Sequence, residues 1–177
     1  MNRLTRVFPI MASLLGAGLF VACTDEATAP TVPQFAEARA ETTTFTRCEA
    51  EPYAYSSGWI GPKGGILKAG KNVFKVPAGA LAAPVFITMA TTSDNINHVV
   101  LRPEGLVFNK NYLPRLVMSY RDCQVTPGTQ PGVAYVNDAL GIIEPTPSYN
   151  DPVNQTVEGK LSHFSDYVLL STYAVVY

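Results

Sequence analysis

The sequence predicts an all-β domain, folded as an antiparallel β-sandwich and preceded by a signal peptide and a flexible tether. Three observations lead to this prediction. The chain starts with a basic and then apolar stretch, continues with a segment rich in Thr, Ala and Pro, and then alternates short β-branched or aromatic runs with Gly, Pro and Asn. Hydrophobic residues make up 47% and charged residues 15% of the 177 residues, which is typical of a globular protein.

Residues 1–22 have the pattern of a secretory signal peptide. Arg3 and Arg6 supply the positive start, and the apolar stretch that follows is shorter than the roughly 20 residues that span a bilayer. The stretch ends in Ala22-Cys23, which resembles the lipobox cut by lipoprotein signal peptidase, with Phe20 where Leu is usual. We therefore expect Cys23 to be the lipidated first residue of the mature chain. The alternative is an ordinary signal peptide with an incidental cysteine.

Residues 23–44 are predicted to be a lipid-anchored tether. The segment has too few large apolar side chains to fold alone, and as a flexible chain it would span about 25 Å. By resemblance to lipoproteins of diderm bacteria, Thr24 after the cysteine favours an exported protein held at the outer membrane. The membrane is thus the first expected partner, and the net charge of −1 gives no indication of nucleic acid binding.

Residues 45–177 are predicted to form the sandwich. Gly61-Pro62, Pro77, Pro127-Gly128 and Asp151-Pro152 are among the breakers between runs, and no segment keeps a helical apolar period. Gly64-Gly65 is expected to turn the chain with positive φ before a strand. The predicted strands cover residues 65–67, 73–76, 85–90, 99–102, 115–120, 134–136, 141–144, 156–161 and 167–172.

Two cysteines remain in the mature domain after Cys23 is assigned to the anchor. Cys48 and Cys123 form an even pair in an exported chain, where a disulfide is more common than two free thiols. The alternative is that both are small buried apolar residues. We expect the disulfide.

Four groups of segments follow one another along the chain: Gly64-Gly65-Ile66-Leu67, then Val76-Pro77-Ala78-Gly79-Ala80-Leu81 with the strand at 85–90, then Leu101-Arg102-Pro103-Glu104-Gly105-Leu106-Val107-Phe108 with Leu113-Pro114 and Leu116–Tyr120, and last Ser162-His163-Phe164-Ser165-Asp166-Tyr167. Together they resemble a ZU5 domain, a β-sandwich module found in receptors and scaffold proteins. The resemblance covers about residues 59–170 and implies a module for protein interaction or structural support. Residues 126–152 have no counterpart in it.

Motifs for cofactor or metal chemistry are not found in the sequence. His98 and His163 are far apart, and neither a zinc-binding spacing nor a phosphate-binding glycine loop is present. We therefore expect no metal, no cofactor and no substrate turnover.

One triplet has a reactive alternative. His163-Phe164-Ser165 resembles the site of self-cleaving proteins, in which the serine hydroxyl attacks the preceding carbonyl and water hydrolyses the resulting ester. That reaction needs a distorted peptide and a donor for the oxyanion, and nothing in the triplet's sequence demands distortion. The alternative that we favour is a turn into the last strand, with Phe164 in the core.

The leading expectation is thus an envelope lipoprotein whose ZU5-like domain binds an envelope or extracellular protein or has a structural role. A self-processing protein that cuts Phe164–Ser165 is the first alternative. A carbohydrate-binding module is the second, because Trp59 and nine tyrosines offer material for an exposed aromatic row.

Overall fold

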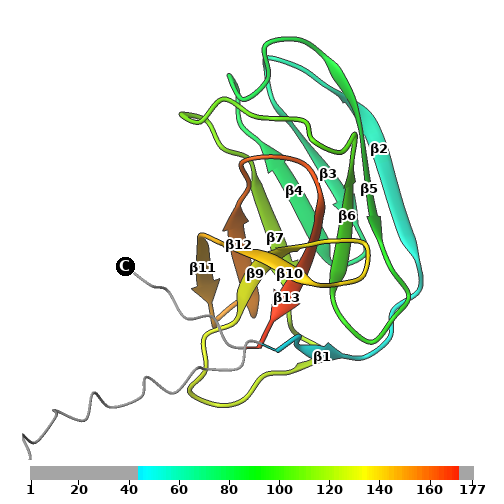
Figure 1. The fold of residues 1–177 in the computed structure, drawn as a ribbon, viewed down its shortest axis with the longest axis vertical. Helices are drawn as coiled ribbons and strands as arrows, with labels where there is room; N and C mark the ends of the chain where they lie inside the picture. The colour runs from blue at the N-terminus through cyan, green and yellow to red at the C-terminus, as the bar shows by residue number, and fades with distance from the viewer. Residues whose placement is uncertain (1–43, 172–177) are drawn as a thin grey trace, which may run out of the picture. The chain divides into compact units, whose positions relative to one another are not determined.

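The computed structural model describes residues 44–171, and this part of the chain is all β (Figure 1). The leader, Cys23 and the tether up to residue 43 lie outside the described residues. Among the described residues, no helix is long and apolar enough to cross a membrane. The strands are β1 (Arg47–Cys48), β2 (Ala54–Ile60), β3 (Gly65–Ala69), β4 (Asn72–Val76), β5 (Val85–Thr91), β6 (His98–Arg102), β7 (Arg115–Ser119), β8 (Cys123–Gln124), β9 (Gly132–Val136), β10 (Ile142–Thr146), β11 (Ser148–Asp151), β12 (Thr156–Lys160) and β13 (Asp166–Leu170).

Two antiparallel sheets pack face to face, as the sequence predicts. The larger sheet has the order β10-β9-β13-β6-β5-β2, and the smaller has the order β11-β12-β7-β4-β3. A two-stranded pair, β1-β8, lies at one end. Because both orders contain hairpin neighbours and also neighbours that are distant in sequence, the fold is a sandwich with crossovers and not a simple meander.

The core lies between the two sheets and is filled by the inward residues of each strand. Phe164 meets Phe108 and Phe74 there edge to face, with ring centroids 4.9 Å and 5.3 Å away. Aliphatic residues and two methionines complete the core, among them Ile87, Met89, Val99, Leu101, Leu116, Met118, Leu161 and Leu169.

Strand β13 is buried on both faces. Tyr167 and Leu169 point into the core, while Val168 and Leu170 belong to a second apolar cluster on the outer side of the six-stranded sheet. Phe45 packs on this outer cluster and pairs with Leu170 through an isolated bridge. The last strand is apolar along its whole length because the core packs on one of its faces and the second apolar cluster on the other.

All nine predicted strands are present, with shifts of up to two residues at their ends. The structure adds β1, β8, β11 and, most importantly, β2. The sequence of β2 reads as a loop because Ser56, Ser57 and Gly58 interrupt it. Its alternation is inverted, with small residues facing inward and aromatic residues facing out.

Gly64 has the backbone that its position requires, with φ of 76°. A Cβ at this residue would lie 2.3 Å from the carbonyl oxygen of Val76. We expect Gly64→Ala to lower the free energy of unfolding by about 2–4 kcal/mol, because it combines an unfavourable φ with a backbone clash. Urea denaturation measures this change.

Gly105 is the matched control for this prediction. Its φ is 75°, yet a Cβ there meets nothing within 4 Å. Gly105→Ala should therefore cost only about 1 kcal/mol. Equal losses for the two variants would show that the clash at Gly64 has no energetic effect.

Candidate functional site

Aromatic side chains gather on the solvent side of β2 and β5. Tyr55 and Trp59 project from β2 and are 54% and 72% exposed, and Phe86 of β5 is 46% exposed. Ser57 lies between the two aromatic residues on the same side of β2. We call this surface the outer aromatic face and define it as Tyr55, Ser57, Trp59, Phe86, Thr88 and Ala90.

The strand register decides how these side chains meet. Trp59 lies opposite Phe86, and their rings contact edge to face with centroids 5.5 Å apart. Ser57 lies opposite Thr88 and Tyr55 opposite Ala90. Tyr55 and Trp59 are about 13 Å apart along the strand at ~3.3 Å per residue. The face therefore has an aromatic residue at each end and two hydroxyls between them.

The inward side of β2 consists mainly of small residues, with Ile60 at its end in the core. Gly58 faces β3, and a Cβ at this position would already lie 3.6 Å from Leu67 Cδ2. Ala54 and Ser56 are the other inward residues of the central part of the strand. Tyr55 and Trp59 alternate with these inward residues and face solvent, so they add little to the core. Their exposure is therefore a property of the surface and not a by-product of packing.

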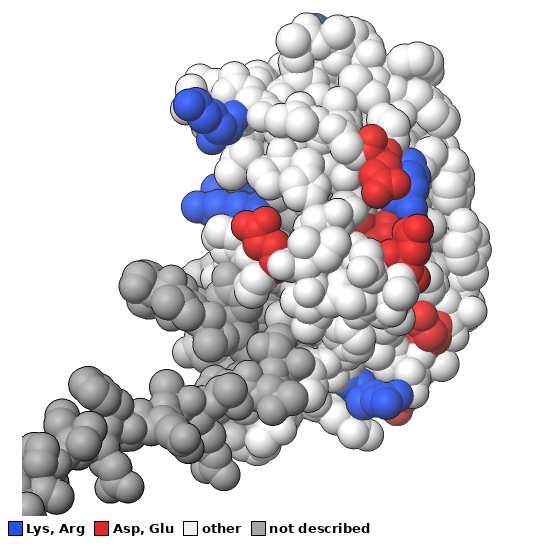
Figure 2. Space-filling view, in the orientation of Figure 1, with Lys and Arg blue, Asp and Glu red and all other residues white. Residues whose placement is uncertain are grey.

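The face continues onto β6, where its one charged side chain is paired. Arg102 lies opposite Thr88, and its Nη1 donates to Asp166 Oδ1 at 2.6 Å. His98 Nε2 lies 3.5 Å from Asp166 Oδ2 but makes no aligned hydrogen bond. Figure 2 shows the margin formed by β2 as an uncharged surface, with acidic and basic side chains further in. The outer aromatic face is thus close to neutral.

Phe164 of the candidate cleavage triplet lies in the core and is fully buried. Its N–H donates to the Leu106 carbonyl, and its own carbonyl accepts from the N–H of Gly105 at 3.0 Å. Ser165 is buried, and its carbonyl accepts from Leu101. Among the described residues, the cis bond and the positive φ values of non-glycine residues lie elsewhere.

His163 turns away from the core toward Tyr135, with ring centroids 4.8 Å apart. Its carbonyl accepts a hydrogen bond of 2.7 Å from the Tyr167 hydroxyl. Burial raises the pKa of Tyr167, so this hydroxyl stays a donor at any physiological pH. The triplet is therefore tied down by ordinary hydrogen bonds, as expected of a turn into a strand. One requirement of the reactive alternative is nevertheless present, because Gly105 donates to the carbonyl that would carry the oxyanion.

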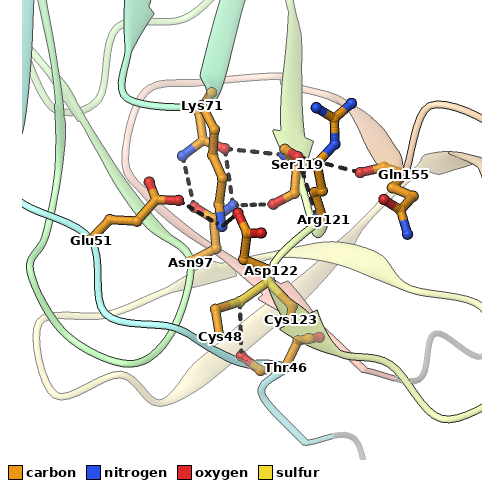
Figure 3. Close-up of a disulfide and its surroundings, with 11 residues drawn as sticks. Thr46, Cys48, Glu51, Lys71, Asn97, Ser119, Arg121, Asp122, Cys123 and Gln155 are labelled. Carbon is orange, nitrogen blue, oxygen red and sulfur yellow. Dashed lines mark hydrogen bonds and ion pairs between the residues drawn. A yellow bond between two sulfur atoms is a disulfide. The ribbon is translucent and has the colours of Figure 1, made fainter.

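Cys48 and Cys123 form a disulfide that joins β1 to β8, where the two residues are directly opposite (Figure 3). Beside it Lys71 Nζ lies 2.8 Å from Glu51 Oε1 and 3.8 Å from Asp122 Oδ2. The distances are those of an ion-paired cluster, although Nζ makes no aligned hydrogen bond.

A pair of buried amides lies next to this cluster. Asn72 Nδ2 donates to Asn97 Oδ1 at 2.7 Å, and Asn97 Nδ2 donates back to Asn72 Oδ1 at 2.9 Å. Asn97 also donates to the carbonyl of Ser119. These contacts have a structural role, since they satisfy buried polar groups and join β4 to the loop before β6.

Metal binding has no support in residues 44–171, where no three His, Cys, Asp or Glu side chains come together in a way that could hold an ion. Comparison with models of known protein families gives no match, and neither does comparison with curated proteins. The ZU5 resemblance therefore stays a prediction.

Proposed function

We propose that the chain is a lipid-anchored envelope protein whose ZU5-like sandwich domain binds a partner through the outer aromatic face. The observation that carries this proposal is the exposure of Tyr55, Trp59 and Phe86 on one side of one sheet. Aromatic residues are the side chains most often found at the energetic centre of binding surfaces. A cluster that contributes little to the core and yet faces solvent fits a binding role.

The lipid anchor predicted at Cys23 is consistent with a binding role at the envelope. Cys23 would hold the mature chain at the membrane through several acyl chains, with Thr24 directing it to the outer membrane. The described fold begins where Phe45 pairs with Leu170 and Thr44 bonds to Ser171. A tether with a reach of about 25 Å keeps the domain close to envelope components.

The mass of the mature protein from its native host tests the anchor and the cleavage triplet together. We expect a chain that starts at an acylated Cys23 and is uncut at Phe164–Ser165, because the triplet lies in unstrained, hydrogen-bonded backbone. Mass spectrometry under denaturing conditions is required, since a cut strand would stay bound by its ladder.

Two controls separate the possible results of that measurement. Cys23→Ser should abolish the acyl mass and the labelling by a clickable fatty acid, and labelling that persists would contradict the anchor. Loss of the mass of residues 165–177, prevented by Ser165→Ala, would instead make self-processing the leading function, with Gly105 as its oxyanion donor.

Binding by the outer aromatic face is tested by truncating it. For the unacylated mature chain, made with Cys23→Ser, we expect Trp59→Ala and Tyr55→Ala each to weaken retention on native envelopes at least about tenfold. Stability should change by no more than about 1 kcal/mol, because these side chains are largely exposed and the Trp59–Phe86 contact lies on the surface. Sedimentation of the chain with the envelopes measures the retention.

Tyr149→Ala is the matched control, since Tyr149 is 70% exposed on β11 of the other sheet. It should bind like the parent chain. Equal losses for Tyr149→Ala and Trp59→Ala would contradict a specific face, and so would full retention of Trp59→Ala.

A further inference from the structure

We infer that the ligand of the outer aromatic face is a neutral polysaccharide chain. This inference rests on the proposed binding function and specifies the class of ligand. It is carried by three features of the face: the separation of its aromatic residues, the hydroxyls between them and the absence of unpaired charge.

The separation of the aromatic residues fits a ligand made of repeating rings. Tyr55 and Trp59 lie on the same side of β2 about 13 Å apart, which exceeds the width of one sugar ring. A pyranose presents a face of C–H groups that packs on an aromatic side chain and loses water on contact. Two such contacts on one straight strand suit a chain of several sugar units lying along β2.

The side chains between Tyr55 and Trp59 are small, and two of them carry hydroxyl groups. Ser57 and Thr88 lie opposite each other, and Ala90 lies opposite Tyr55. These short side chains let a bulky ligand approach the sheet, while the two hydroxyls donate to and accept from sugar hydroxyls. A purely apolar ligand would leave them unpaired at a cost.

The lack of unpaired charged side chains on the outer aromatic face favours a neutral ligand. The outward residues of β2 and β5 are Tyr, Ser, Trp, Phe, Thr and Ala, and the adjacent Arg102 is held by Asp166 at 2.6 Å. An acidic glycan or an anionic membrane needs unpaired Lys or Arg, which these positions do not provide. The paired guanidinium still has further N–H groups, next to Thr88, that can donate to sugar hydroxyls.

The other occupants of such a face are an envelope protein and a lipid surface. A protein could add a strand to β2, which is an edge of its sheet. That contact would use the backbone of β2 and would not require Thr88. A lipid surface would bury the aromatic side chains but would not hydrogen-bond to the hydroxyls between them. The response to Thr88→Val therefore discriminates a polysaccharide from both.

The test uses the unacylated mature chain and three probes from the host envelope: its protease-treated neutral glycan fraction, its protein fraction freed of glycan, and vesicles of its extracted lipids. Trp59 is the only tryptophan, so its emission reports directly on the face. We expect a saturable blue shift with the glycan fraction, abolished when periodate has oxidised the vicinal diols of the glycan. Tyr55→Ala should weaken binding at least about tenfold and Thr88→Val about threefold, whereas Tyr149→Ala should have no effect.

The Trp59→Ala variant has no tryptophan emission, so its binding is measured by how far its migration is slowed in gels that contain the glycan fraction. A shift of Trp59 with the protein fraction or the vesicles, and none with glycan, would overturn the polysaccharide inference while the binding function stands. No response to any of the three probes would overturn both.

Discussion

Phe164→Ala should lower the free energy of unfolding by about 3–5 kcal/mol. Phe164 is fully buried, and its ring contacts Phe108 and Phe74 edge to face, at centroid distances of 4.9 Å and 5.3 Å. Truncation removes the burial of the ring and leaves a cavity between the two sheets. Because a domain is stable by only about 5–15 kcal/mol, the urea midpoint should fall strongly.

Two variants calibrate this result. Phe164→Leu keeps part of the volume and should cost less than the alanine variant. Val107→Ala, at a residue that is 73% exposed and bridges His163 through its backbone, should change stability by no more than about 0.5 kcal/mol. If Phe164→Ala left the midpoint unchanged, Phe164 would not be a core residue, and the reactive alternative for the triplet would gain weight.

Removal of the Cys48–Cys123 disulfide is expected to cost about 4 kcal/mol on the chain-entropy model. The two cysteines are 75 residues apart in sequence, so the bridge closes a long loop in the unfolded chain. Strands β1 and β8 have only two residues each, so their own ladder adds few hydrogen bonds beside the bridge. The double variant Cys48→Ser/Cys123→Ser, unfolded in urea beside the parent chain, measures the effect.

The control is the parent chain with and without reductant. Reductant should lower the midpoint of the parent chain but leave that of the double variant unchanged. Ready alkylation of both cysteines in the folded, unreduced chain would rule out the bridge.

The fold class follows from the sequence because its signals are local. Gly64 must take positive φ, and Pro77 ends β4, so turn chemistry marks where many strands begin and end. Strand β2 was not predicted, because strand prediction depends on large residues facing the core. In β2 three of the four inward residues, Ala54, Ser56 and Gly58, are small, and only Ile60 is a large core residue.

The candidate site depends on register, which the sequence does not encode locally. Trp59 and Phe86 become neighbours only because β2 pairs with β5, and Arg102 meets Asp166 only because β6 pairs with β13. The alternation of Tyr53, Tyr55 and Trp59 was the available signal for an outward aromatic row. The disulfide could be predicted because only two cysteines remained after Cys23 was assigned to the anchor.

Binding by the outer aromatic face is tested most directly by a ¹⁹F spectrum of the unacylated mature chain labelled with 5-fluorotryptophan. Trp59 is the only tryptophan, so one resonance reports on the outer aromatic face even among the proteins of a native envelope. The binding proposal predicts that this resonance shifts and broadens when host envelopes are added, and that Tyr55→Ala weakens the change. A Trp59 resonance whose chemical shift stays unchanged, or a Tyr55→Ala chain that is retained on the envelopes like the parent chain, would contradict it.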